Sequence, residues 1–479
     1  MEYLDTTIPK SKFNKEFRKH YDSYYFSLRK EYLNIIDVNF YKKINLDLLV
    51  SSVSEKNISS SYIFHNICLY YSIKKLLSKR NIETIHVENT FLKKNIELFY
   101  AGTVNVRNSK KIHIVNIFRI LLKQFSIFFV SKLISKDKKI KSKINLIDIF
   151  ITSNNLKIDR YYNNFFLNKK LFYYIPTFVN LSLRKIISCL LYFNKKNYIL
   201  KSQFMTFKDF LYSINFTFRV NKIKIKNIFF RKLNIKDLIL RELYLRQNLN
   251  ASIIGLQNYL FAKNLKDKKI ELKSVLNWNE NSIVDKGWNY GFRSSYVNLN
   301  TFGYQGFYVE KKLSSIDITS NELKAKTCPE YIMIVGSILR KSRSEFVKKI
   351  KFIQSRAFRF EYLLLKKFYK KKINNKIIIL LNLDKETCIE IIDKIKKTKF
   401  AKNNNTVFIK EHPLLRLNQF YKKLLPNNFQ IIEGNFYDVI KKFKVIITSG
   451  SSSSVYESLL SGSKIIFPIN DYYDNLNLE

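Results

Sequence analysis

The sequence predicts an α/β protein with two Rossmann-like lobes facing a cleft and a doubly wound parallel sheet in the C-terminal lobe. Its 479 residues correspond to two or three domains at about 150 residues each. Six short β-branched runs, separated mostly by helical patterns, lie between residues 331 and 467. The ten glycines lie almost entirely after residue 254, so the turns that βα connections require are concentrated in the second half.

The N-terminal part, residues 1–140, is predicted to be an α/β extension without a chemical motif. A helix is expected near residues 67–79, followed by a short strand at 84–87. This extension contains the most apolar run of the chain, Ile114–Ile134, which as a helix could span about 30 Å of hydrocarbon.

Basic side chains inside this run argue against a spanning helix. Arg119, Lys123 and Lys132 would each cost about 2.5 to 3.5 kcal/mol near the centre of a bilayer. Two interpretations remain open, an ordinary core helix or a helix lying in the membrane interface. In the second, Phe118, Leu122, Phe125 and Phe129 would face the lipid and the lysines would lie among anionic headgroups.

The predicted N-terminal lobe, residues 141–318, opens with a buried strand at Ile144–Thr152 that runs into a polar loop. A second short strand is expected at Ser252–Gly255. Gln257 and Asn258 follow it, and we expect their side chains to lie at the cleft.

The predicted C-terminal lobe, residues 325–479, has the clearest alternation of strands and helices. In the helical segment Asp384–Lys397, apolar residues repeat at i, i+3, i+4 and i+7. Apolar strands separated by such helices indicate a parallel sheet covered on both faces, and ligands bind at the carboxyl ends of its strands. The strands are expected at 331–335, 376–383, 406–410, 429–432, 444–448 and 464–467.

Two loops at these strand ends carry unusual chemistry. The first reads Lys410-Glu411-His412-Pro413, where an imidazole and an ammonium could donate hydrogen bonds to a phosphate. A single histidine is also compatible with a purely structural role.

The second loop reads Thr448-Ser449-Gly450-Ser451-Ser452-Ser453-Ser454 and precedes a helix. Hydroxyl groups and free backbone N–H groups at a helix N-terminus favour an anion such as phosphate. A capping box formed by Ser454 and Glu457 would explain those two residues, although it does not require the preceding serines.

These segments resemble the C-terminal domain of GT-B glycosyltransferases. A KxHP-like segment precedes a serine-rich loop that opens a helix with Glu, and a small residue, Gly462 and a strand ending in Pro468 follow. The pattern is most similar to bacterial surface carbohydrate (capsule and lipopolysaccharide) biosynthesis proteins. It is more distantly similar to polysialyltransferases, Kdo transferases and polyglycerolphosphate transferases. Residues 253–258 are similar to the Q-H-G turn of several of these families, although Asn258 and Tyr259 replace the His and Gly.

The resemblance implies a metal-independent glycosyltransferase that needs no cofactor and uses as substrate a nucleotide-activated sugar, linked to CMP or to another nucleotide. The acceptor would be a growing surface polysaccharide or a lipid-linked glycan. The donor phosphate would be held by Lys410, His412, Ser449, Ser451, Ser452 and Ser453. Glu457 and Pro413 would contact the ribose or nucleotide.

The acceptor hydroxyl requires a general base, usually a carboxylate on the opposing lobe. Asp148, Asp159, Glu242 and Asp285 are candidates, and the sequence does not choose among them.

Motifs of several other enzyme classes do not occur in the sequence. It contains no DxD, GxGxxG, GxxxxGK[ST] or HExxH, which argues against metal-dependent GT-A enzymes, dinucleotide oxidoreductases, P-loop NTPases and zinc hydrolases. We predict no metal site. Gly287, Gly291, Gly303 and Gly306 lack dinucleotide spacing and are predicted to lie in turns between short strands.

The formal net charge of +47 is compatible with nucleic acid, an anionic membrane or acidic substrates. Because the basic residues are spread over the whole chain, codon bias explains the charge equally well, and we do not expect a nucleic-acid partner. We expect peripheral contact with an anionic membrane. A teichoic-acid-type polyol-phosphate transferase, a basic nucleic-acid-binding protein and an inactive truncated transferase remain alternatives.

The four cysteines are widely spaced without a CxxC pair, which favours a reduced cytosolic setting. The first 15 residues show no secretory signal. We therefore expect a cytoplasmic protein, peripheral on the inner face of the membrane. The chain ends soon after Pro468, where a GT-B domain would normally continue, so a truncated reading frame is also considered.

Overall fold

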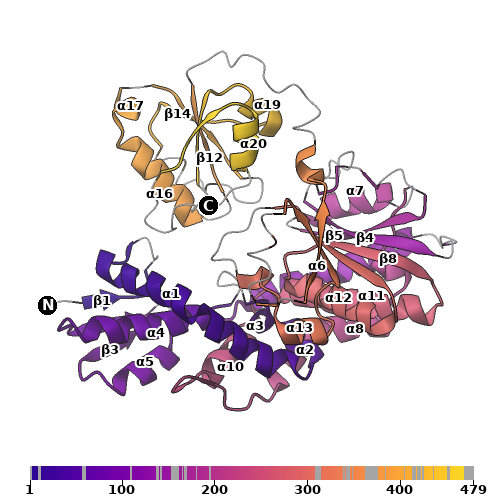
Figure 1. Ribbon diagram of the computed structural model, residues 1–479, viewed down its shortest axis with the longest axis horizontal. Helices are drawn as coiled ribbons and strands as arrows, with labels where there is room; N and C mark the ends of the chain where they lie inside the picture. The colour runs from indigo at the N-terminus through magenta and orange to yellow at the C-terminus, as the bar shows by residue number, and fades with distance from the viewer. Residues whose placement is uncertain are drawn as a thin grey trace. The chain divides into compact units, whose positions relative to one another are not determined.

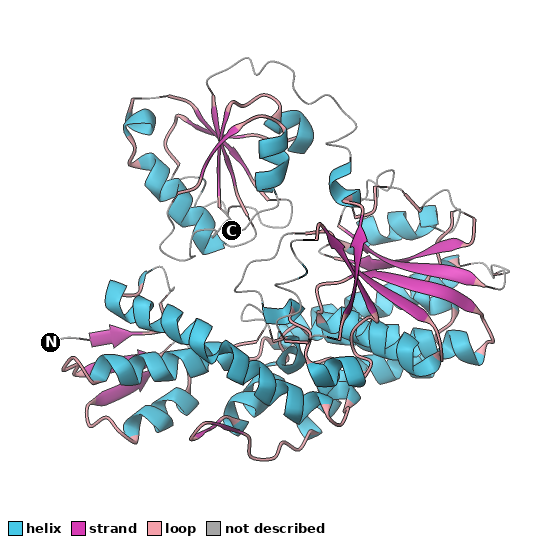
Figure 2. Ribbon diagram, in the orientation of Figure 1, coloured by secondary structure: helices cyan, strands magenta, loops and turns pink. Residues whose placement is uncertain are grey.

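The computed structural model describes most of the chain between residues 3 and 468 (Figure 1). Outside the described residues within these limits lie 9–11, 57–60, 108–110, 136–139, 141–142, 153–160, 164, 167–169, 180, 194–195, 308–313, 338–339, 341–345, 348, 362–375, 383–384, 404, 413–416, 418–421, 423–424, 435 and 450–453. The chain divides into two compact units, with the main division between Arg356 and Ala357. The short segments Pro9–Lys12 and Phe307–Glu310 are grouped with the second unit. Each unit contains a parallel sheet with helices packed against it (Figure 2).

The first unit begins with a small three-stranded parallel sheet in the order β1-β2-β3. Its elements are β1 (Tyr3–Asp5), α1 (Lys15–Ile36), the π-helix η2 (Asp37–Tyr41), α2 (Leu46–Leu49), α3 (Ser52–Glu55), α4 (Ile63–Leu77), β2 (Thr84–Val87), α5 (Thr90–Glu97), β3 (Thr103–Val106) and α6 (Ile114–Ile134). The predicted strand at 84–87 and the predicted helix at 114–134 are confirmed. The apolar faces of α1 and α4 supply much of the core beside this sheet, since nearly every turn of α1 buries an aromatic or aliphatic side chain.

The main sheet of the first unit has six parallel strands in the order β11-β10-β9-β8-β4-β5. Its elements are β4 (Ile144–Ile151), β5 (Phe172–Phe178), α7 (Leu183–Phe193), η3 (Lys201–Gln203), α8 (Phe207–Ile214), α9 (Phe216–Arg219), η4 (Val220–Lys222), β6 (Phe229–Phe230), β7 (Leu233–Asn234), α10 (Lys236–Leu245), α11 (Leu249–Asp267), β8 (Leu272–Trp278), α12 (Ile283–Ser295), β9 (Asn300–Gln305), η5 (Ser314–Ile316), α13 (Ser320–Lys324), β10 (Tyr331–Val335), β11 (Lys351–Ser355) and η6 (Phe358–Phe360), the last of which belongs to the second unit. The strand order reverses between β4 and β8, which is a topological switch point of the Rossmann-like type.

The second unit has five parallel strands in the order β14-β13-β12-β15-β16. Its elements are β12 (Ile377–Leu380), α16 (Lys385–Lys396), α17 (Lys399–Lys402), β13 (Val407–Lys410), β14 (Phe429–Ile431), α19 (Phe436–Ile440), β15 (Val445–Thr448), α20 (Ser454–Leu460) and β16 (Lys464–Ile466). Neighbouring residues of β12 point to opposite faces. Ile379 packs with Ile391 of α16, and Ile378 packs with Ile440 of α19. The sheet is therefore doubly wound, and the predicted α/β fold with two Rossmann-like sheets is confirmed.

The strand Tyr331–Val335 belongs to a different sheet from the one expected. We assigned it to the C-terminal lobe, but as β10 it pairs in parallel with β9 and β11 in the first unit. An apolar β-branched run has the same pattern in either sheet. The sequence therefore predicts the strand but not the sheet to which it belongs.

The predicted strand at Ser252–Gly255 is wrong, because these residues lie inside helix α11. Helices α11 and α12 pack so closely that a Cβ on Gly287 would lie 2.0 Å from the backbone oxygen of Gly255, and one on Gly291 would lie 2.8 Å from the Cα of Tyr259. The prediction that Gly287 and Gly291 occupy turns is therefore also wrong. Glycine is needed at these positions because two helix backbones touch there.

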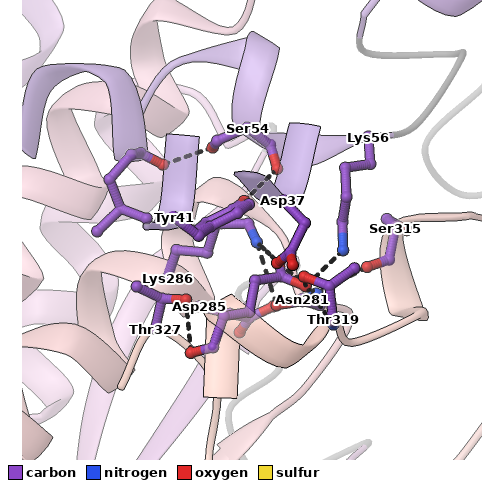
Figure 3. A network of polar contacts seen from close by, with 12 residues as sticks. Asp37, Tyr41, Ser54, Lys56, Asn281, Asp285, Lys286, Ser315, Thr319 and Thr327 are labelled. Atoms are coloured by element: carbon purple, nitrogen blue, oxygen red, sulfur yellow. Dashed lines mark hydrogen bonds and ion pairs between the residues drawn. The ribbon is translucent and has the colours of Figure 1, made fainter. Parts of the chain in front are cut away.

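A buried ionic network fastens the N-terminal segment to the main sheet's helices (Figure 3). Lys56 Nζ donates to Glu322 Oε2 at 2.6 Å, and Lys286 of α12 donates to the other carboxylate oxygen of Glu322. All three side chains are fully buried. Burial alone would raise the pKa of Glu322, but the two ammonium groups hold it well below its usual range.

Further pairs extend this network along the N-terminal segment. Asp37 accepts from the backbone and side chain of Asn321, and Arg29 pairs with Asp317. Tyr41 donates to the carbonyl of Ser54 at 2.7 Å. Residues 1–8 and 13–140 thus belong to one compact unit with the main sheet.

Candidate functional site

The carboxyl edge of the second unit's sheet brings the two predicted loops to one side. Leu380 of β12 pairs in register with Lys410 of β13 and with Thr448 of β15. Because the three strands are parallel, the loops after β13 and β15 leave from the same edge. At one strand spacing each side of β12, their first residues lie roughly 10 Å apart.

The switch point of this sheet lies between β12 and β15, and two polar side chains meet there. Asn382, just after β12, donates from Nδ2 to Oγ of Ser449, just after β15, at 2.8 Å. Both residues are buried. In open α/β sheets the crevice outside such a switch point is where ligands bind. Ser449 is therefore a loop-positioning residue, since its hydroxyl oxygen accepts from Asn382.

Sequence reasoning missed Asn382. It lies two residues past the end of β12, inside the segment 376–383 that was expected to be a strand, and nothing in the sequence identifies β12 as the strand beside the switch point. Cys388 of α16 also contacts Asn382, through Sγ–Oδ1 and Sγ–O distances of 3.3 and 3.5 Å.

The first loop begins with Lys410, whose Nζ donates to the carbonyl of Gly434 at 2.9 Å. Burial lowers the pKa of Lys410 from its ordinary value. His412 follows two residues later and is partly exposed. Glu411 accepts from the backbone N–H of Leu417 at 2.8 Å.

The structure describes only some of the other residues predicted to bind the nucleotide-sugar donor. Pro413 and the serines Ser451, Ser452 and Ser453 lie outside the described residues. Glu457, predicted to contact the ribose, is 5% exposed in the first turn of α20.

In the first unit, Asp148 is the candidate base with acid–base partners. It lies in β4, 1% exposed, and its Oδ1 accepts from the hydroxyl of Thr177 at 3.1 Å. Thr177 in turn accepts from Lys201 Nζ at 3.1 Å. Burial raises the pKa of Asp148 to about 6 and lowers the pKa of Lys201 to about 8.

Thr177 and Lys201 line a cavity of about 70 Å³ beneath α6. Its other polar lining residues include Gln124, Ser131 and Gln257. Gln257 was predicted to reach a cleft, and from α11 it donates to Oε1 of Gln124 at 3.2 Å. A relay of hydrogen bonds thus runs from the cavity wall through Lys201 and Thr177 to Asp148.

Two buried amides lie at the switch point of the first unit's sheet, where β8 runs beside β4. Asn277 of β8 is fully buried, and its Nδ2 donates to Asp285 Oδ1 at 2.7 Å. Asn279, one residue past β8, is also fully buried, and neither of its side-chain polar atoms has a partner among the described residues. Sequence reasoning missed both residues.

Asp285 serves as a helix cap, and its oxygens are already occupied. It is the third residue of α12 and closes a capping box with Ser282, whose backbone N–H donates to Oδ2 at 2.9 Å. Glu280 N also donates to Oδ2, and Asn277 donates to Oδ1. Burial raises the pKa of Asp285 to about 7. With both oxygens held by fixed donors, Asp285 is poorly placed to accept a substrate proton.

The side chains of Glu242 and Asn258 are buried and make hydrogen bonds to the backbone of neighbouring segments. Glu242 of α10 is 4% exposed, and its Oε2 accepts from the backbone N–H of Tyr62 at 2.9 Å. Asn258 was expected at the cleft, but it is fully buried in α11 and donates to the carbonyl of Val284 of α12. That expectation is wrong, because the segment is a helix whose Asn258 face is turned against α12. Asp159 lies outside the described residues.

Among the described residues, no group of three or more His, Cys, Asp or Glu side chains is arranged to hold a metal ion. The four cysteines are buried and unpaired with one another.

Comparisons with known proteins give only distant likenesses. No protein-family model matches the sequence, and no curated protein matches it. Among solved structures, UDP-N-acetylglucosamine 2-epimerase from Rickettsia bellii is 13% identical over 66% of this chain and 76% of its own, with a TM-score of 0.37. MurG from Acinetobacter baumannii is 10% identical over 69% of this chain and 81% of its own, with a TM-score of 0.35. Similarity this low carries no argument about activity.

Proposed function

We propose that the protein is a glycosyltransferase that moves a sugar from a nucleotide-activated donor to a surface polysaccharide or lipid-linked glycan. The second unit would bind the donor, and the first would bind the acceptor and supply the general base. The observation that carries the proposal is the register of Lys410, Leu380 and Thr448. It brings a cationic loop and a hydroxyl-rich loop to the switch-point edge of a doubly wound sheet.

The chemistry of this edge suits a nucleotide leaving group. When the bond to the sugar breaks, negative charge develops on the phosphate oxygens, and donors already aimed at them lower the barrier. Lys410 and His412 supply cationic or N–H donors in one loop, and the predicted contribution of Ser451–Ser453 would come from the other. Removing one such donor typically costs about 2.7 to 4 kcal/mol of transition-state stabilisation.

Asp148 is the general base that the structure favours over Glu242 and Asp285. Both carboxylate oxygens of Asp285 accept from fixed donors, whereas Oδ2 of Asp148 has no hydrogen-bond partner among the described residues. Burial raises the pKa of Asp148 to about 6, which brings it towards the operating pH of a base. Lys201 and Thr177 would hold the carboxylate in place through the hydrogen bonds that they donate towards it. Inverting stereochemistry, metal independence and a CMP-linked donor follow from the sequence resemblance alone.

A thermal-denaturation screen against CMP, CDP, UDP and GDP tests the donor assignment. A nucleotide at 100 times its Kd should stabilise the protein by about 2.7 kcal/mol. Sugars linked to the best nucleotide are then incubated with the protein, and products are identified by mass spectrometry. His412→Ala should lose the stabilisation while retaining the melting temperature of the ligand-free protein. Absence of any nucleotide response, or an unchanged response in His412→Ala, would contradict the proposal.

The same screen separates the alternatives. Transfer of a polyol phosphate would leave phosphate in the product, whereas sugar transfer would not. A nucleic-acid-binding protein would instead bind DNA or RNA with a steep dependence on salt concentration and would ignore nucleotides.

A further inference from the structure

Helix α6 is mostly apolar, buries few of its side chains and exposes a broad apolar side. Its buried residues are Gln124, Phe128 and Ser131. The exposed side carries Phe118, 63% exposed, and Leu122, 53% exposed, and the helix also exposes Ile114, Val115, Phe125 and Leu133. Within the described residues, α6 is the one helix long and apolar enough to cross a membrane, and only 17% of its most apolar window is buried. A helix in water normally has the opposite pattern.

The buried side of α6 is fixed to the rest of the unit by hydrogen bonds. Gln124 Nε2 donates to Oδ1 of Asn250 in α11 at 2.8 Å, and the Ser131 hydroxyl donates to Ser202 Oγ at 2.7 Å. Lys132 donates to the carbonyl of Ser202 at 2.8 Å. These bonds specify which side faces outwards, so the exposure of the apolar side belongs to the fold.

Helix α8 extends this apolar surface. Phe125 and Phe129 of α6 have ring centroids 4.3 Å apart, and Phe129 lies 5.9 Å from Phe207 of α8. Phe207 is 49% exposed, and Leu211, one turn along α8, is 37% exposed. We call Phe118, Leu122, Phe125, Phe207 and Leu211 the α6–α8 apolar face.

The helices that build this region carry positive charge and almost no negative charge. Between Arg107 and Ser135 the sequence has no Asp or Glu, and it contains Arg119, Lys123 and Lys132 within α6. Helix α7, which packs beside α6, contains Arg184 and Lys185, both exposed, and no acidic residue. Such a surface is complementary to anionic lipid headgroups.

We propose that the α6–α8 apolar face docks into the interface of an anionic bilayer, with α6 lying parallel to the membrane plane. Exposed aromatic side chains would insert among the acyl chains, and the exposed Arg119, Arg184 and Lys185 would contact lipid phosphates. A spanning orientation is inconsistent with the hydrogen bonds that hold one side of α6 along α11 and η3. This inference is independent of the proposed transferase activity.

Vesicle co-sedimentation of the full chain tests the proposal. Wild type should bind vesicles of phosphatidylcholine mixed with phosphatidylglycerol, bind phosphatidylcholine alone more weakly, and release as salt rises. The triple variant Phe118→Ser, Leu122→Ser, Phe125→Ser should lower the partition coefficient at least about tenfold. A matched control, Leu98→Ser with Val297→Ser, removes two side chains that are 82% and 86% exposed elsewhere and should bind as wild type does.

Three results would overturn the proposal. They are failure of wild type to bind the mixed vesicles, equal binding by the triple variant, and an equal loss in the control. Circular dichroism melting verifies that each variant is folded; a triple variant that does not fold is replaced by Phe118→Ser alone, judged by the same criterion. Sedimentation velocity without lipid tests whether a second copy of the chain, and not a membrane, covers the α6–α8 apolar face. A concentration-dependent dimer that the variant abolishes, without vesicle binding by wild type, would also overturn the proposal.

Discussion

Asn382 and Ser449 are hydrogen-bonded across the switch point of the C-terminal sheet, at a distance of 2.8 Å between Nδ2 and Oγ. The two residues are 67 positions apart in the sequence. Their contact fixes the start of the serine-rich loop against the end of β12. This hydrogen bond lies at the point where the sheet topology favours a ligand.

Asn382→Asp should weaken nucleotide binding, although the two side chains have nearly the same shape. The substitution places a carboxylate beside Ser449 at the carboxyl edge of the sheet, and a negative charge there opposes a phosphate. We expect Kd to rise at least about tenfold, which corresponds to about 1.4 kcal/mol. Isothermal titration calorimetry measures the change. Asn405→Asp, which adds the same charge just before β13 at the amino edge, is the matched control. Equal weakening by both variants would refute a specific site at the carboxyl edge.

Asp148→Asn should change stability in a pH-dependent way. The pKa of Asp148 is raised to about 6 in the folded protein, so folding favours its protonated form. That advantage is fully present below the unfolded pKa of about 4 and is lost as the pH rises through 6. Over this window wild type should lose about 3 kcal/mol relative to the variant, since each unit corresponds to about 1.4 kcal/mol. Urea unfolding at pH 4 and pH 7.5 measures the difference, and a pH-independent difference would contradict the burial argument.

Glu322→Gln should strongly destabilise the first unit. The variant leaves the buried ammonium groups of Lys56 and Lys286 without their shared carboxylate, and losing one partner of a buried ionic group costs about 3 to 5 kcal/mol. Denaturant unfolding followed by circular dichroism gives the change. Glu330→Gln breaks a surface pair with the exposed Lys351 and should change stability little. Similar effects of the two substitutions would show that the buried network does not hold the N-terminal segment in place.

Gly287→Ala tests the close packing of α11 on α12. The added methyl group would lie 2.0 Å from the backbone oxygen of Gly255, so the helices must separate. Overpacking of this kind costs about 1 to 3 kcal/mol or more. Ser294→Ala, on an exposed position of α12, is the control and should fall within about 0.5 kcal/mol of wild type. Thermal melting that is unchanged in Gly287→Ala would disprove the contact.

Sequence periodicity located most of the strands in the C-terminal sheet, because each is a short apolar run between polar loops. It could not tell which strands share a sheet, and Tyr331–Val335 was therefore assigned to the wrong lobe. The same pattern analysis predicted a strand at Ser252–Gly255, because four apolar or small residues fit both the period of a strand and the period of a helix. The glycines of α12 suggested turns because close helix packing leaves no signal besides the glycines themselves.

The candidate site was only partly predictable for a related reason. Lys410 stands out as the polar end of an apolar strand and Ser449 as the polar residue directly after one, and their shared edge follows from parallel pairing. Asn382 and Thr177 become significant only through contacts with residues distant in the sequence. The choice of Asp148 over Asp285 depends on which oxygens are already occupied by hydrogen-bond donors, and this is a property of the folded chain alone.

The most direct measurement is the Kd of the best-binding nucleoside phosphate for wild type, Lys410→Ala and Lys464→Ala by isothermal titration calorimetry. Lys410 ends β13 at the carboxyl edge, whereas Lys464 begins β16 at the amino edge of the same sheet. Hydrogen bonds between charged groups contribute about 1.5 to 3 kcal/mol, so Lys410→Ala should raise Kd at least about tenfold. Lys464→Ala should leave it unchanged. Equal Kd values for all three proteins, or a loss confined to Lys464→Ala, would contradict a phosphate site at the carboxyl edge.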